Sequence, residues 1–504
     1  MSKDSSDKNQ PRVKADRMAV GTTATLGATI VSRVAGIVNS IIIVRALGVY
    51  DVGVLAIIGL IVAVASVTAS MGIPPAMVKF LSGPTPGSLR EPGRLIGAGL
   101  VIVGISTAAT VVIIVLLAST VFVSVYNDSR IPMLILVSLV SVVTSVVAST
   151  LFSVFQGFER ILEMSIREMA ISAISIPATY FLVQGYGLFG AVLVAVASSG
   201  IAVFVKVPLL RRVWREHGVK VTFPREPPHY RALLNFAIPA FLSTLMVTTV
   251  LWFSSTLLAT SASFVALGQY SVANGLAGYL LLVSASIGIP LVPIVARLNR
   301  DDPGQVSPFL IKTLRITTFL SLPPAVVLVS LPSPFLSLLY GSQYMTAAPL
   351  VAILGPAMFL ASLSNIVGYS IAGIGRMWDG FYLNLIWAVG LVVLSITLVP
   401  AYGAVGLALA VLGAYVGHFV GVLFYLRAAL SVPLKALGPP VGTAGIALIG
   451  SAFAYALERP WNLVALSVGL GMLLIVEYFA LSPRELAVLV GPARRVFNWI
   501  GRSP

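Results

Sequence analysis

Apolar segments of about 20 residues or more recur fourteen times along this chain of 504 residues. About 20 apolar residues form a helix long enough to cross the hydrocarbon core of a bilayer. The segments lie roughly at 19–46, 51–78, 95–125, 131–156, 164–184, 187–210, 232–260, 264–296, 308–339, 346–372, 378–400, 404–426, 436–457 and 461–482. Backbone polar groups in lipid must be satisfied internally. The pattern therefore predicts an all-α polytopic membrane protein with about fourteen transmembrane helices.

The few charged residues are placed unevenly between the apolar segments. Only 10% of the residues are charged, whereas soluble proteins have roughly 25%. If the N-terminus is inside, 28 of the 32 lysines and arginines fall on cytoplasmic segments and three on outside segments. This bias predicts a multi-pass protein of the cell membrane with both termini cytoplasmic. The net charge of +15 then indicates contact with anionic membrane lipids rather than with nucleic acid.

Short sequences from the first part of the chain return later at one constant offset. The matching pairs are Gly157–Arg160 with Gly373–Arg376, Tyr186–Gly190 with Tyr402–Gly406, and Gly72–Pro74 with Gly288–Pro290. Three matches at one offset indicate a duplicated half, an architecture found in secondary transporters with a site between the halves. Six segments separate the copies, and six is even. We therefore expect two parallel six-helix repeats, followed by two additional C-terminal helices.

The repeat and the charges together predict six parts of the chain. These are a cytoplasmic tail at 1–18, an N-terminal six-helix lobe at 19–210, a basic cytoplasmic linker at 211–231, a C-terminal six-helix lobe at 232–428, helices 13 and 14 at 429–483, and a cytoplasmic amphipathic tail at 484–504. The first tail is polar and basic and lacks the apolar core of a signal peptide.

The residues that would carry enzymatic chemistry are missing or scattered. The chain has no cysteine, and its three histidines lack metal-ligand spacing, so we expect no metal site. No Gly-Lys-Ser/Thr phosphate loop is present, which argues against ATP-driven pumping. The short outside loops offer no pair of acids for glycosyl chemistry. The sequence therefore favours a protein that is not an enzyme and needs no cofactor.

The first apolar segment has a polar stripe along one face. At 100° per residue, one sector roughly 120° wide holds Thr25, Thr29, Ser32, Arg33, Gly36, Asn39 and Ser40. A charge facing lipid costs several kcal/mol, so we expect Arg33 to line a cavity. The alternatives are snorkelling to the cytoplasmic headgroups or pairing with a buried acid. Glu477 is the acid that the sequence places deep within a segment.

Further polar residues give weaker signals. Thr248 and Asn274 lie in the seventh and eighth segments, although a threonine often bonds its own backbone and an asparagine often joins helices. Glu163 and Arg167 have the spacing of a surface ion pair at the start of the fifth segment. His418 is interpreted as a hydrogen-bonded packing residue.

A set of loose motifs, in a fixed order, covers most of the chain. They are Ser32–Gly36, Arg45–Gly48, Phe155–Arg160, Leu339–Tyr344, Ala372–Arg376 and Val399–Gly406. In these residues the chain resembles the oligosaccharide and polysaccharide flippases (Wzx-type) of the multidrug/oligosaccharidyl-lipid/polysaccharide exporter (MOP) superfamily. The opening motif is also similar to that of lipid II flippases.

The resemblance implies two V-shaped lobes around a central cavity that works by alternating access. The cargo would be a polyprenyl-(di)phosphate-linked oligosaccharide, with glycan-assembly enzymes as further partners. A guanidinium matches diphosphate oxygens, so Arg33 would bind the diphosphate. The other expected substrate-binding residues are Thr29, Asn39, Ser40, Thr248 and Asn274. Two alternatives stay open: a peptidoglycan-precursor (lipid II) flippase, and a cation-coupled multidrug antiporter, which would need membrane carboxylates.

Overall fold

The computed structural model describes residues 31–82 and 91–433, apart from 159, 217, 225 and 226, and a few positions between 435 and 471. All regular structure in these residues is helical, and nine of the helices are long and apolar enough to cross a membrane. The chain divides into two compact units, Met1–Trp252 and Phe253–Pro504. The predicted tails at 1–18 and 484–504 lie outside the described residues, as does most of the predicted helices 13 and 14.

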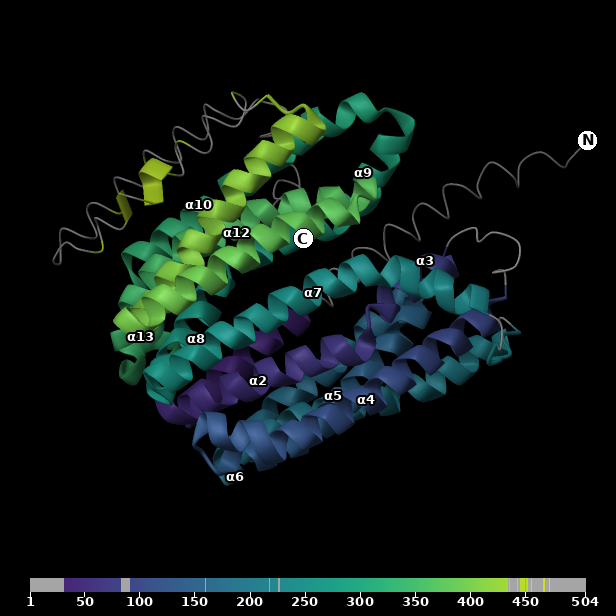
Figure 1. Ribbon diagram of the computed structural model, residues 1–504, viewed down its shortest axis with the longest axis horizontal. Helices are drawn as coiled ribbons and strands as arrows, with labels where there is room; N and C mark the ends of the chain where they lie inside the picture. Colours follow the sequence, from purple (N-terminus) through teal and green to yellow (C-terminus); the bar gives the residue numbers. More distant parts are fainter. Residues whose placement is uncertain are drawn as a thin grey trace, which may run out of the picture. The chain divides into compact units, whose positions relative to one another are not determined.

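The first unit is built around one central helix. Its elements are a helix over 31–46, α2 (Val49–Ser70), α3 (Ile73–Ser82), α4 (Pro92–Tyr126), α5 (Arg130–Gly157), α6 (Ile161–Glu216) and the first part of α7 (Pro227–Ser261). Helix α5 packs against α2, α3, α4 and α6 (Figure 1). Its buried face carries serine and threonine as well as apolar side chains. This polar content inside the unit becomes important for the site below.

The second unit repeats the plan around α12. Its further elements are α8 (Phe264–Gly278), α9 (Leu281–Asp301), η2 (Pro303–Gln305), α10 (Val306–Ser330), α11 (Pro332–Tyr340), η3 (Ser342–Ala347), α12 (Ala348–Ile374) and α13 (Met377–Leu430). Helix α12 packs against α8, α9, α10 and α13. It is the most buried of the candidate spans among the described residues.

The longest helices each contain two of the predicted spans. Helix α6 is interrupted at Gly187 and α13 at Gly403, where the backbone leaves the helical region. These positions fall at the predicted boundaries between 164–184 and 187–210, and between 378–400 and 404–426. Conversely, the predicted span 51–78 comprises α2 and α3, which are separated by the left-handed residue Met71.

The constant offset of the sequence repeat is reproduced in local geometry. Gly187 has φ 54° and ψ −129°, and its counterpart Gly403 has φ 56° and ψ −130°. Three residues later, a Cβ on Gly190 or on Gly406 would lie 1.9 or 2.1 Å from the carbonyl oxygen eight residues earlier. Both kinks therefore fold the chain back on itself in the same way.

Equivalent ion pairs stand at the starts of α6 and α13. Arg160 pairs with Glu163, and at the equivalent positions of the second half Arg376 pairs with Asp379 at 2.6 Å. The prediction that Glu163 pairs with Arg167 is therefore wrong, because the partner of Glu163 is Arg160. The bend after α5 brings Arg160 instead of Arg167 to this carboxylate.

Candidate functional site

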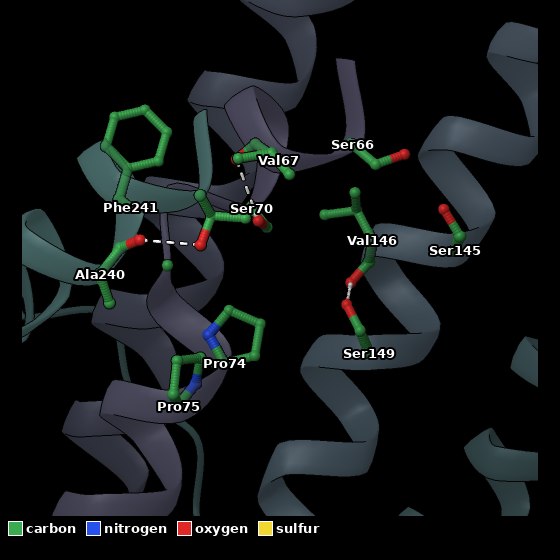
Figure 2. A pocket seen from close by; sticks show the side chains of 12 residues that line it. Ser66, Val67, Ser70, Pro74, Pro75, Ser145, Val146, Ser149, Ala240 and Phe241 are labelled. Carbon is green, nitrogen blue, oxygen red and sulfur yellow. Dashed lines mark hydrogen bonds between the residues drawn. The ribbon is translucent and has the colours of Figure 1, made fainter. Parts of the chain in front are cut away.

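A pocket of about 420 Å³ opens beside the break between α2 and α3, and we call it the kink pocket. Its lining comes from α2, the α2–α3 break, α3, α5 and α7 (Figure 2). The residues are Ser66, Val67, Ser70, Gly72, Pro74, Pro75, Ser145, Val146, Ser149, Ala240, Phe241 and Thr244. None of these side chains is charged, so the polar character of the pocket rests on hydroxyl groups.

Four of the five hydroxyl groups that line the kink pocket donate their protons to backbone carbonyls. Ser70 Oγ donates to Val67 O at 3.1 Å, and Ser149 Oγ donates to Val146 O at 3.0 Å (Figure 2). Thr244 Oγ1 likewise donates to the carbonyl one turn earlier, at 2.9 Å. Serine and threonine in helices commonly make such bonds. The lone pairs of these hydroxyl oxygens remain free, so the pocket can accept hydrogen bonds from a bound molecule.

A second cavity of about 550 Å³ lies between α5 and the two halves of α6, and we call it the α6 cavity. Ser145 and Ser149 line both the kink pocket and the α6 cavity, so the two spaces meet along α5. The α6 cavity is also rich in serine, but it differs from the kink pocket because it contains charge.

An ion pair between the halves of α6 supplies this charge. Lys206 Nζ lies 2.5 Å from Glu168 Oε1, and the side chains are 6% and 34% exposed. The ammonium also donates to Ala148 O at 3.3 Å and lies 5.5 Å from the centre of the Phe152 ring. A buried ammonium needs such partners, because removing it from water costs several kcal/mol. Lys206 therefore joins both halves of α6 to α5.

Neither member of this pair is among the site residues that the sequence predicts. The charge bias places Lys206 with the cytoplasmic basic residues, and the sequence indicates only Glu477 as a deep acid. The structure instead buries Lys206 within α6. One feature of the sequence could have indicated this ion pair. Glu168 lies near the start of one predicted span, and Lys206 lies near the end of the next. An antiparallel hairpin brings such positions together.

Arg33 and Ser40 lie on the helix over 31–46, where Arg33 is exposed and Ser40 half-buried. Asn39 on the same helix donates from Nδ2 to Ser175 Oγ at 2.7 Å. Ser175 lines the α6 cavity. The Oδ1 atom of Asn39 is buried and has no hydrogen-bond partner within the described part of the chain. Thr29 lies outside the described residues.

Thr248 and Asn274 lie on different helices. Thr248 Oγ1 donates to Thr244 O at 2.9 Å and to Leu245 O at 3.1 Å, so its proton is used within α7. It stands one turn beyond Thr244, which lines the kink pocket. Asn274 is half-buried in α8 of the second unit. Of the predicted residues that the structure describes, Asn39 is bonded to the side chain of a residue that lines the α6 cavity, and Thr248 to the backbone of one that lines the kink pocket.

His418 is buried in α13, as expected for a packing residue. Its Nδ1 atom has no hydrogen-bond partner among the described residues. The ring lies 6.4 Å from the ring of Tyr415, and Tyr415 lies 5.6 Å from Trp387. The histidine therefore packs beside Tyr415, which in turn packs beside Trp387. Within the described residues, no group of three His, Cys, Asp or Glu side chains could hold a metal ion.

A charged cluster joins the start of α2 to the turn between α4 and α5. Arg130 contacts Asp51 and Asp128, each at 3.0 Å, and Tyr50 donates to Asp128 at 3.1 Å. The hydrogen bond from the Arg130 guanidinium holds the pKa of Asp128 below its ordinary value. The cluster fixes this end of the first unit.

The family described as "Polysaccharide biosynthesis protein" matches residues 18–299, which is more than half of the chain. The chain belongs to this family. The match includes the polar stripe, the kink pocket and the α6 cavity. No curated protein matches the sequence.

Solved structures of the MOP superfamily share the fold. A lipid II flippase, MurJ, in an inward closed conformation is 15% identical with a TM-score of 0.69, over 92% of this chain and 98% of its own. An inward-facing multidrug resistance MATE transporter is 14% identical with a TM-score of 0.68, over 79% and 94%. A MOP transporter from Pyrococcus furiosus is 12% identical with a TM-score of 0.59, over 89% and 94%. The protein is thus a multi-pass membrane protein with the fold of MOP transporters.

Proposed function

We propose that this protein is a flippase that moves a polyprenyl-(di)phosphate-linked oligosaccharide across the cell membrane by alternating access. The observation that carries the proposal is the match to the polysaccharide biosynthesis family over 18–299. Glycans for the cell surface are built on such lipids, and their polar heads cannot cross hydrocarbon unaided. A carrier with polar side chains inside its helical bundle lowers this barrier.

The placement of Arg33 supports an anionic cargo group. Its side chain is exposed on the helix over 31–46, whereas Ala35 on that helix is buried in the first unit. A guanidinium free of that packing can meet diphosphate oxygens with two parallel hydrogen bonds. We infer that Arg33 binds the diphosphate, and that Asn39 and Ser40, with Thr29, contact the adjacent sugar. Thr248 and Asn274 complete the proposed set.

The proposed topology has fourteen spans with both termini cytoplasmic. The two kinked helices each supply two spans. Their shared geometry favours two parallel six-helix repeats, with two further helices after residue 428 and a basic linker at 211–231. Alternating access then requires each half to move as a body, and the same break in each half suits such a motion.

Reconstitution into liposomes tests the proposal. The probe is a polyprenyl-diphosphate disaccharide with a fluorophore on the sugar, distributed over both leaflets and exposed to a membrane-impermeant quencher. Protein-free liposomes should lose about half of the fluorescence, because one leaflet is exposed, and liposomes with the protein should lose nearly all of it. Equal quenching with and without the protein would contradict the proposed function.

The same assay separates the alternatives. Faster movement of a lipid II probe than of several disaccharide-lipid probes would favour a peptidoglycan-precursor flippase. Uptake of a cationic dye driven by an ion gradient, without movement of either lipid, would favour a multidrug antiporter. The exposed Arg33 repels a cationic dye, which supports the oligosaccharide cargo.

A further inference from the structure

The two halves of the chain differ in the side chains that they place between the central helix and the long kinked helix. Helices α6 and α13 correspond residue for residue at the offset of the repeat, including the kink at Gly187 and Gly403. In the first half, this framework encloses the α6 cavity of about 550 Å³. In the second half, six of the twelve matching positions carry larger side chains, and six carry smaller ones.

Three matched positions show the difference. Ile171, Ser199 and Ala202 line the α6 cavity. Their counterparts at the offset of the repeat are Trp387, Tyr415 and His418. Trp387 and His418 are 4% and 9% exposed, and their ring centres lie 5.6 and 6.4 Å from that of Tyr415. Filling such a space with apolar contacts stabilises a protein, whereas leaving it open costs stability. The first half keeps the space open, which points to an occupant.

The charges in the α6 cavity favour a neutral occupant. Glu168 and Lys206 neutralise one another at 2.5 Å, so neither a free cation nor a free anion meets an unopposed charge. The ammonium stands beside the carboxylate, where a metal ion would otherwise bind, and it repels such an ion. Glu168 remains one-third exposed and can still accept hydrogen bonds.

The hydroxyl groups of the cavity favour an occupant rich in donors. Ser175 Oγ donates to Ser172 O at 2.7 Å, and Ser199 Oγ donates to Ala195 O at 2.9 Å. Their remaining lone pairs accept. Ser175 Oγ also accepts from Asn39 Nδ2 at 2.7 Å, which holds this serine at the cavity wall. The ring of Phe152 adds an apolar surface. Acceptors around an apolar ring suit a pyranose, which has hydroxyl donors at its edge and C–H groups on its faces.

We propose that the α6 cavity is a binding site for one neutral sugar residue. Glu168 accepts hydrogen bonds from adjacent hydroxyl groups of the sugar, Phe152 packs on the sugar face, and the serines of the lining accept further hydrogen bonds. The cavity lies within the usual size range of small-molecule sites. The site deepens the proposed function and rests on it for the origin of the sugar, which is the glycan of the cargo.

The site lies toward one end of α6. Glu168 is five residues, or about 7 Å, from Glu163, and Lys206 is ten residues, or about 15 Å, from Glu216. Arg160 pairs with both Glu163 and Glu216 and so closes that end of the hairpin. By the predicted topology this end is cytoplasmic, which is the side where the cargo is made. The cavity would then hold a sugar during loading.

The test measures binding of free sugars, so it does not depend on transport. Purified protein in lipid nanodiscs is titrated with glucose, galactose, N-acetylglucosamine and glucuronate, and contact is followed by saturation-transfer NMR. We expect saturable binding of at least one neutral sugar and weaker binding of glucuronate. The double variant Ser199→Tyr with Ala202→His places the second half's side chains in the cavity. It should weaken binding at least about tenfold.

Two further variants make the result specific. Ile201→Tyr adds the same ring on the exposed face of that helix turn, and it should bind as the unaltered protein does. Glu168→Gln with Lys206→Met removes both charges at similar volume, and it should also weaken binding. Melting temperatures are measured for all variants, and binding is compared among those that stay folded.

Several outcomes would overturn the site. These are no saturable sugar binding by the unaltered protein, equal binding by the filled variant, and equal binding by the charge-free variant. Movement of the lipid-linked probe in the liposome assay with no sugar binding would overturn the sugar site alone. Sugar binding that the filled variant loses, with no movement of any lipid-linked probe, would overturn the proposed function and leave the site standing.

Discussion

Gly187 and Gly403 adopt nearly the same positive-φ backbone conformation in the two halves of the chain, with φ 54° and ψ −129° at the first and φ 56° and ψ −130° at the second. Each interrupts a long helix, of 56 and 54 residues respectively, and allows the chain to turn back. A residue with a side chain rarely adopts such a conformation. The duplicated Tyr-Gly pair in the sequence thus encodes a duplicated hairpin.

We predict that Gly187→Ala destabilises the protein by about 1–3 kcal/mol, because the alanine Cβ strains this conformation. The matched control is Gly185→Ala, which lies two residues earlier, has no positive φ and has open space around its Cβ. Thermal unfolding of the purified protein measures both. A melting temperature for Gly187→Ala equal to that of the control would contradict the prediction.

The cluster at the α4–α5 turn should depend on pH in the acidic range. The folded-state pKa of Asp128 is lowered, chiefly by the hydrogen bond from Arg130. A carboxyl with a lowered pKa stabilises the fold above its unfolded pKa, about 4, and loses this effect as pH falls through the folded pKa. Asp128→Asn should therefore lower the melting temperature by a constant amount from pH 5 to 8. The difference in melting temperature between the variant and the unaltered protein should shrink below about pH 4. An unchanged difference at pH 3 would contradict this role of Asp128.

Arg33 should be essential for transport of an anionic cargo and dispensable for folding. Arg33→Ala should abolish movement of the lipid-linked probe, because the exposed guanidinium contributes little to packing. Arg33→Lys should retain part of the activity, since an ammonium lacks the planar two-pronged geometry. Arg33→Glu should be inactive through repulsion. Transport is normalised to protein amount, and full activity of Arg33→Ala would leave Arg33 as a structural charge.

The charge bias predicts cytoplasmic termini, and the absence of cysteine makes labelling straightforward. Single cysteines at Ser5 and Ser503 should resist an impermeant maleimide in intact cells and react after lysis. A cysteine at Ser129, in the exposed α4–α5 turn, should react in intact cells. Labelling of either terminus from outside would contradict the topology.

The segment before α7 lies directly on α4. A Cβ on Gly97 would lie 2.1 Å from Thr222 O, and Thr222 N donates to Gly93 O at 3.2 Å. Gly97→Leu should displace this segment, so trypsin should cleave after the exposed Lys220 faster than in the unaltered protein. The rate of cleavage is measured by mass spectrometry of the fragments. Gly104→Leu on the same helix has open space around it and should cleave like the unaltered protein. Equal cleavage rates in both variants would contradict the contact between α4 and the segment before α7.

The helical class, the positions of most described spans and the offset between the halves follow from the amino-acid sequence alone. Length and hydropathy suffice for these, because the bilayer admits few backbone solutions. The predicted span boundaries also fell near the two hairpin turns, at 184–187 and 400–404, where the structure interrupts the helices at Gly187 and Gly403. The family resemblance agreed with the later match over 18–299.

Which polar side chains meet depends on how the helices pack in three dimensions, and the sequence patterns do not show it. Helical periodicity gives the face on which Asn39 lies, but its bond to Ser175 depends on how two helices pack. Glu168 and Lys206 lie in different halves of α6, and the turn at Gly187 sets which residues of the hairpin face one another. A shift of a single residue rotates a helical side chain by about 100°. The cavity and its ion pair therefore follow from packing geometry that no local pattern encodes.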